Sequence, residues 1–161
     1  MPPRFRTRRQ VNAMLRGIEF PSGSFEAMQN FMQTWLGRQI RIEHHDFRGS
    51  SVCGVWLGSR NEPVDRIFTD LNSPHWRQTV AHEWGHMLCG HDTADDDVEV
   101  LRTLAPLLPE SALRFALTRD SFTTPQEQDA EAVGDAISLL LLAEESRAAS
   151  VQSLGGFGRV L

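Results

Sequence analysis

The chain has no lysine and no tyrosine, so all 16 of its basic residues are arginine. The absence of tyrosine removes one common side chain for stabilising an oxyanion during catalysis. Only two cysteines are present, which excludes a disulfide framework and favours a reducing, cytoplasmic compartment. The longest uninterrupted apolar run is Leu139–Ala143, far shorter than the about 20 residues that span a bilayer. Neither membrane insertion nor secretion is therefore expected.

The basic residues are unevenly distributed. The whole chain carries 16 basic and 21 acidic residues, a formal net charge of −5, yet residues 1–16 hold five arginines and no acid. The remainder therefore carries a formal charge of −10. An acidic body disfavours direct nucleic-acid binding and suits a basic partner, such as a DNA-binding protein. We interpret residues 1–9 as a solvated basic arm.

The 161 residues are enough for one domain with a hydrophobic core. Hydrophobic periodicity and turn residues predict helices first, then a small sheet, then more helices, which is typical of the α+β class. We expect one domain over residues 10–145 and a flexible C-terminal tail over residues 146–161. The expected helices cover residues 9–16, 25–36, 73–89, 98–105, 111–117 and 124–145, and the expected strands cover residues 39–44, 52–57 and 66–69.

Four residues provide start and stop signals for two of these helices. Ser24 is the predicted N-cap of the helix over residues 25–36, and Gly37 ends that helix. Ser73, followed by a proline, is the predicted N-cap of the next helix, which Gly90 ends.

Residues 82–86 read His-Glu-Trp-Gly-His and lie inside this last helix. Residues four apart on a helix lie about 40° apart around the axis, so His82 and His86 can bind one metal ion. Zinc prefers such nitrogen ligands. Glu83 is rotated by about 100° from His82, so it flanks the ion and is the predicted general base that takes a proton from the attacking water.

Zinc needs a third protein ligand, for which the spacing leaves several candidates. Glu127 and Glu131 share one face of the helix that begins near residue 124, so one carboxylate could bind the metal while the other orients a histidine ligand. Spacing alone favours the two equally. Asp92 is a weaker candidate: it lies six residues after His86, but Cys89 occupies the position where the turn glycine of such sites is expected.

The HExxH helix is accompanied by the segments Ile67–Asp70, Ser73–Arg77, Ala81–Leu88 and Glu127–Glu131, and upstream by the strand Cys53–Leu57 and the helix end Trp35–Arg38. Together these segments resemble the ImmA/IrrE family of zinc metallopeptidases, which share the HExxH motif and are gluzincin-like. In that family a strand, a Ser-Pro turn and the metal-binding helix follow one another, as they do here. The resemblance covers about residues 18–143.

The resemblance implies a small zincin-like domain whose short mixed sheet is packed by helices, with HExxH on a central helix. It implies one zinc ion bound by His82, His86 and Glu127, with Glu131 supporting a ligand from outside the coordination sphere. It also implies an endopeptidase that cleaves a helix-turn-helix repressor in a regulatory or toxin-antitoxin-like pair. The alternative is a non-catalytic zinc protein that regulates a partner by binding it. Glu83 favours the enzyme, because a purely structural zinc site needs no general base.

Overall fold

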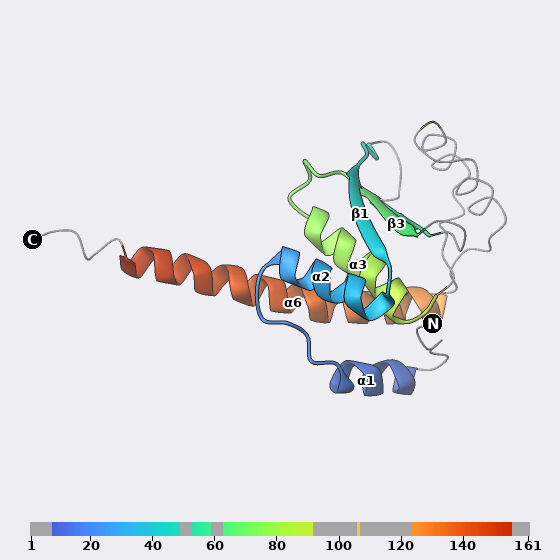
Figure 1. The fold of residues 1–161 in the computed structure, drawn as a ribbon, viewed down its shortest axis with the longest axis horizontal. Coiled ribbons are helices and arrows are strands. Elements are labelled where there is room, and N and C mark those ends of the chain that lie inside the picture. Colours follow the sequence, from blue (N-terminus) through green and yellow to red (C-terminus); the bar gives the residue numbers. More distant parts are fainter. Residues whose placement is uncertain (1–7, 49–52, 59–62, 92–105, 107–123, 156–161) are drawn as a thin grey trace, which may run out of the picture.

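The computed structural model describes residues 8–48, 53–58, 63–91, 106 and 124–155. Within these ranges four helices accompany a three-stranded mixed sheet, which confirms the α+β class (Figure 1). The helices are α1 (Arg8–Gly17), α2 (Phe25–Leu36), α3 (Trp76–Leu88) and α6 (Thr124–Gly155), and the strands are β1 (Gln39–His44), β2 (Gly54–Leu57) and β3 (Val64–Thr69).

Strand β3 is the centre of the sheet, parallel to β1 and antiparallel to β2. Its successive residues Ile67 and Phe68, which point to opposite faces of the sheet, are both fully inaccessible to solvent. The same strand also buries Asp65, a charge that needs compensation in an apolar setting. The guanidinium of Arg38 provides it by donating to Asp65 Oδ1 at 2.7 and 2.9 Å.

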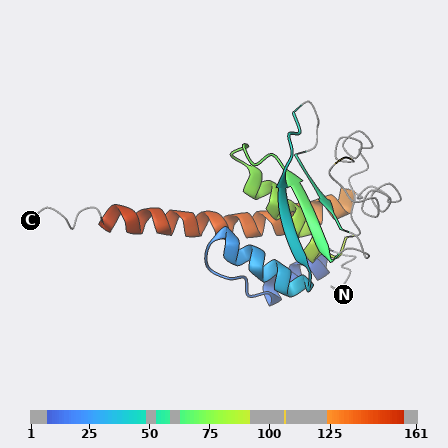
Figure 2. The ribbon, with the colours of Figure 1, turned by 45° about the horizontal axis from the view of Figure 1, so that its top comes forward.

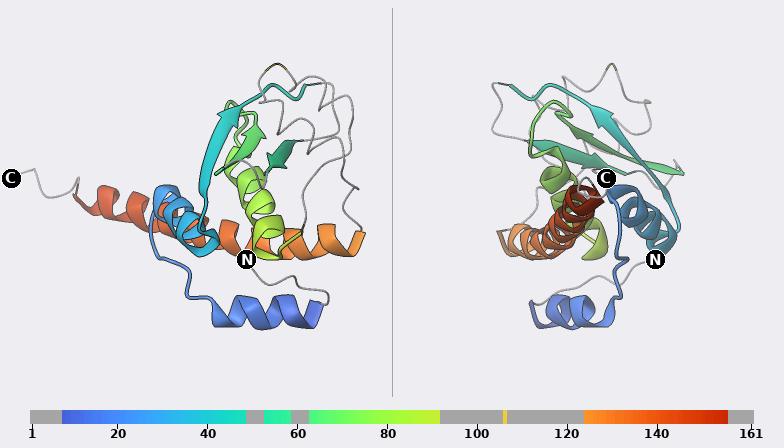
Figure 3. Two further views of the ribbon diagram at one scale, coloured as in Figure 1. Left: turned by 45° about the vertical axis from the view of Figure 1, so that its right-hand side comes forward. Right: turned by 90° about the vertical axis from the view of Figure 1, so that its left-hand side faces the viewer.

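Helix α3 lies in the middle of the molecule, as expected for the helix that carries HExxH. It packs on β2 and β3 on one side and on α6 on the other, and α1 lies beyond α6 (Figure 3). Val80, Trp84 and Leu88 recur at four-residue spacing and are all fully buried. Trp84 also stacks on Phe25 of α2, with ring centroids 5.1 Å apart. This apolar face fixes the helix against the core.

Helices α3 and α6 approach so closely that glycine is required at both contact points. A Cβ atom on Gly85 of α3 would lie 2.9 Å from the carbonyl carbon of Ala130 and closer still to its oxygen. A Cβ atom on Gly134 of α6 would lie 2.9 Å from the Cα of His82. Real side chains do not tolerate such distances from backbone atoms, so the two glycines set the spacing of the helices.

The helix boundaries confirm most of the predicted caps and correct one. Ser24 Oγ accepts a hydrogen bond from the backbone N–H of Ala27, and Gly37 ends α2 with a φ of 65°. Gly90 follows α3 with a φ of 67°. The prediction that Ser73 caps α3 is wrong, because the helix begins only at Trp76. The Ser73 hydroxyl instead accepts from the His75 N–H at 3.2 Å and stabilises the preceding turn.

The last helix is longer than predicted. It continues to Gly155 rather than ending near Glu145, so residues 146–155, expected in a flexible tail, are helical. This stretch contains no proline, and glycine occurs only at its end, so nothing in it breaks the helix. The C-terminal part of α6 extends beyond the sheet and the other helices (Figure 2).

Several sequence-based expectations lie outside the described residues. They are most of the basic arm, and the helices over residues 98–105 and 111–117. Strand β2 is described from Gly54 onward, and β3 begins at Val64, two residues earlier than expected. Among the described helices, none combines the length and the apolar character needed to cross a membrane.

Substitution of Gly85 by alanine tests the close helix crossing. The added methyl group would meet the backbone of α6, so we expect Gly85→Ala to lower the free energy of unfolding by about 1–3 kcal/mol, measured by urea denaturation. Gly17→Ala is the matched control, because the added Cβ would meet no atom within 4 Å beyond the neighbouring backbone of its own helix. We expect this control to be neutral or stabilising by up to about 1 kcal/mol. Equal effects of the two substitutions would contradict the role of Gly85.

The two cysteines should differ sharply in reactivity. Cys89 is fully buried, and burial raises the pKa of its thiol to about 12, whereas Cys53 is exposed. The thiolate is the form that reacts with thiol reagents. At pH 8 we therefore expect such a reagent to modify Cys53 rapidly and Cys89 only in denaturant. Cys53→Ser should remove the rapid phase. Two rapid phases in the native wild-type protein would show that Cys89 is accessible.

Candidate metal centre

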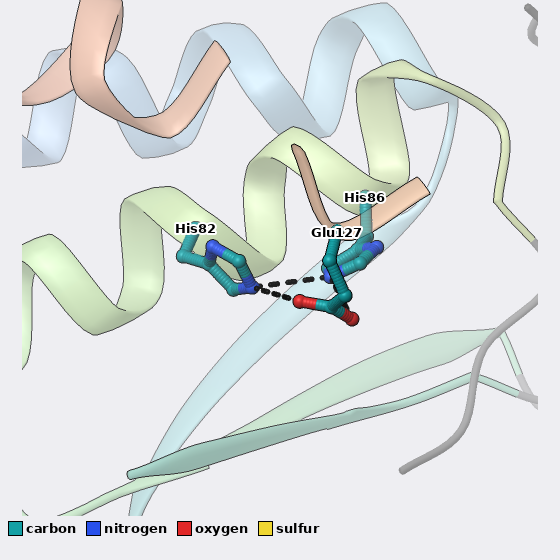
Figure 4. Close-up of side chains that lie close together, drawn as sticks. All are labelled: His82, His86 and Glu127. Atoms are coloured by element: carbon teal, nitrogen blue, oxygen red, sulfur yellow. Dashed lines mark hydrogen bonds and ion pairs between the residues drawn. The ribbon is translucent and has the colours of Figure 1, made fainter. Parts of the chain in front are cut away.

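Three side chains from two helices converge between α3 and α6 (Figure 4). His82 and His86 extend from successive turns of α3, and Glu127 comes from the start of α6. The two Nε2 atoms lie 3.2 Å apart. Glu127 Oε2 is 3.2 Å from His82 Nε2, and Oε1 is 3.4 Å from His86 Nε2. Nitrogen and oxygen donors this close together form a group that could hold a metal ion.

The group runs from the core to the surface. The side chain of His86 is 2% exposed, that of His82 33% and that of Glu127 46%. The His86 ring is therefore fixed by packing, while solvent and a small ligand can reach the side formed by the other two residues. A metal site with one position open to solvent needs this combination of rigidity and access.

The electrostatics of the group follow from these positions. Hydrogen bonding to His82 and then to His86 holds the pKa of the Glu127 carboxyl well below its usual range. The pKa of His82 is raised, chiefly by its hydrogen bond to Glu127. The pKa of His86 is lowered because burial disfavours its charged form. Near pH 7 the group therefore offers a carboxylate and a neutral His86 imidazole, both in a form that binds metals.

Glu83 lies beside this group but is not one of its three donors. It is only 6% exposed, and its carboxylate contributes to the raised pKa of His82. Its Oε1 atom is 3.7 Å from the position that a Cβ on Gly54 would occupy, which places the carboxylate between α3 and strand β2. A buried acid next to a metal-ligand group is in a suitable place for proton transfer.

The candidates for the third ligand lie at different places relative to the two histidines. Glu127 joins the histidines, whereas Glu131, one turn further along α6, is exposed and is not part of the donor group. The charge of Glu131 makes a minor contribution to the raised pKa of His82. Asp92 lies outside the described residues.

Spacing rules did not find two features of the centre. One is the pair of glycines that set the distance between α3 and α6. The other is His91, whose Nδ1 lies 3.0 Å from the Nδ1 of His86 on the side of the ring away from His82. His91 is 4% exposed, and burial, followed by the charge of His86, lowers its pKa to about 4. In the sequence, His91 is marked only by its place directly after Gly90, the glycine that ends the helix.

Comparison with protein-family models, with curated proteins and with solved structures found no match to this chain. Membership in the ImmA/IrrE family therefore stays a prediction from the residues quoted above.

Glu127→Gln tests the donor group directly. Loss of a residue that merely orients a metal ligand typically weakens metal binding by about 10–100-fold. Removing the Glu127 carboxylate charge should weaken zinc binding by at least this factor, because Glu127 is itself a proposed ligand. The affinity is measured by competition with a chromophoric chelator. Glu131→Gln is the matched control, with the same chemical change four residues away, and should bind zinc within about threefold of wild type. The reverse ranking would assign the third ligand to Glu131.

Proposed function

We propose that this protein is a zinc-dependent metallo-endopeptidase that cleaves a protein substrate. The observation that carries the proposal is the convergence of His82, His86 and Glu127 into one donor group with the buried carboxylate of Glu83 beside it. The first three residues provide ligands, and the fourth provides a base that a purely structural metal site does not need.

The separations within the group support zinc as the metal. A tetrahedral ion with bonds of about 2.0–2.1 Å needs ligand atoms about 3.3 Å apart. The two imidazole nitrogens are 3.2 Å apart, His82 Nε2 is 3.2 Å from Glu127 Oε2, and His86 Nε2 is 3.4 Å from Glu127 Oε1. These separations are close to the required value, so only a small movement of the carboxylate would bring one oxygen and both nitrogens onto a single ion. Two nitrogen donors with one carboxylate oxygen are also a common ligand set for catalytic zinc.

The chain's own residues supply the remaining chemistry. Zinc, when bound, supplies a Lewis acid that polarises the scissile carbonyl. Glu83 accepts a proton from the attacking water and then donates it to the leaving amine, so that no proton is released into the solvent. Glu83 is buried beside the donor group, so packing holds its carboxylate in place for this role.

We further propose a DNA-binding repressor of the helix-turn-helix class as the substrate. This part of the proposal is supported by the resemblance of residues 67–88 and 127–131 to the ImmA/IrrE family. It is also supported by charge: outside residues 1–16 the chain carries a formal charge of −10, which complements a basic DNA-binding surface.

Glu83→Gln separates catalysis from metal binding. The amide cannot take up the proton, so we expect cleavage to fall by about 10²–10⁴-fold while zinc is still bound in a 1:1 ratio. The substrate for the assay is a proteome-derived peptide library, and mass spectrometry identifies the cleaved bonds. Intact DNA-binding proteins that contain the cleaved sequences are then tested in the same way.

Two outcomes would contradict the proposal. Cleavage by Glu83→Gln at the wild-type rate would remove Glu83 as the base. A wild-type protein that binds zinc but cleaves neither peptides nor intact repressors would favour the alternative, a zinc protein that regulates its partner by binding.

A further inference from the structure

We infer that His91 is a positioning residue of the metal centre: its Nδ1 accepts a hydrogen bond from Nδ1–H of His86 and thereby orients the ring that presents Nε2 to the ion. This inference rests on the proposed function, because it assigns a role to His91 only if the group of His82, His86 and Glu127 binds metal.

The two nitrogens of His86 face in different directions. Its Nε2 is 3.2 Å from His82 Nε2 and 3.4 Å from Glu127 Oε1, so this atom belongs to the donor group. Its Nδ1 points away from the group and lies 3.0 Å from His91 Nδ1. A neutral imidazole that binds a metal through one nitrogen carries its proton on the other. The Nδ1–H of His86 is therefore the donor, and His91 Nδ1 must be the acceptor.

The backbone places His91 in position for this contact. Gly90 adopts a φ of 67°, which reverses the chain after the last turn of α3. The N–H of His91 then donates to the carbonyl of His86 at 3.0 Å. His91 is thus attached to His86 twice, once through the backbone and once through the ring. This double attachment fixes the side-chain contact in both distance and direction.

Burial strengthens the effect of this hydrogen bond. His86 is 1% exposed and His91 is 4% exposed, so water has little access to compete for the Nδ1–H of His86. In such surroundings a lost hydrogen bond leaves a buried donor without a partner, which is costly. Loss of the acceptor should therefore weaken metal binding through the orientation of His86, although His91 does not touch the ion.

Two substitutions of His91 distinguish an acceptor from a merely space-filling side chain. His91→Leu fills the site but accepts no hydrogen bond, whereas His91→Asn keeps an oxygen acceptor at the δ position. The exposed His75 gives a control, since its side chain makes no capping hydrogen bond to α3. The full-length variants are compared for zinc affinity by chelator competition and for the visible absorption spectrum of bound Co²⁺.

We expect His91→Leu to weaken zinc binding by about 10–100-fold and to alter the Co²⁺ spectrum. His91→Asn should recover most of the affinity, and His75→Leu should behave as wild type. Equal affinities for wild type, His91→Leu and His91→Asn would overturn the inference and leave the zinc site standing. A wild-type protein that binds no zinc would overturn both the inference and the proposed function.

A measurement on the wild-type protein covers the case in which the leucine variant does not fold. Two-bond ¹H–¹⁵N correlation spectra of the zinc-loaded protein report which imidazole nitrogens carry a proton. We expect a protonated Nδ1 on His86 and an unprotonated Nδ1 on His91. A protonated Nδ1 on His91 would overturn the inference without any substitution.

Discussion

The candidate centre depends on the close contact between α3 and α6. Gly85 and Gly134 bring the backbones together at two points, where any Cβ atom would meet the opposite helix. At this spacing Glu127 lies 3.2 Å from His82 Nε2 and 3.4 Å from His86 Nε2. Larger residues at the two contact points would push the helices apart and move the carboxylate away from the rings. The two glycines thus set the distances within the donor group of His82, His86 and Glu127.

The second constraint is the unequal burial of the three donor residues. His86 lies in the core, contacts the other donors through one ring nitrogen and His91 through the other, and so has little freedom to rotate. Glu127 is almost half exposed and leaves the outer side of the group accessible. A site built in this way combines a rigid inner part with an open outer part. That combination would leave one side of a bound ion accessible to a further ligand.

Much of the fold followed from local patterns. Helix α2, its capping residues and the order of strands and helices were predicted because periodicity and turn chemistry act over a few residues. Ser73 was misassigned, since Ser-Pro is compatible both with a helix start and with the turn that precedes one. The end of α6 is predicted too early, because the serine, alanine and glycine residues after Glu145 suggest a flexible tail. These residues disfavour a helix only weakly, and no proline or internal glycine breaks it, so α6 continues to Gly155.

For the centre itself, the sequence alone determined the pair of histidines and the acid between them, because the helix repeat places residues four apart on one face. It could not decide between Glu127 and Glu131, which have the same chemistry and share a helical face. That choice depends on where α6 crosses α3, a contact between segments far apart in the chain. The tertiary structure brings Glu127, and not Glu131, to the two histidines. The position of His91 is likewise a tertiary feature, because it depends on how the chain turns back at Gly90.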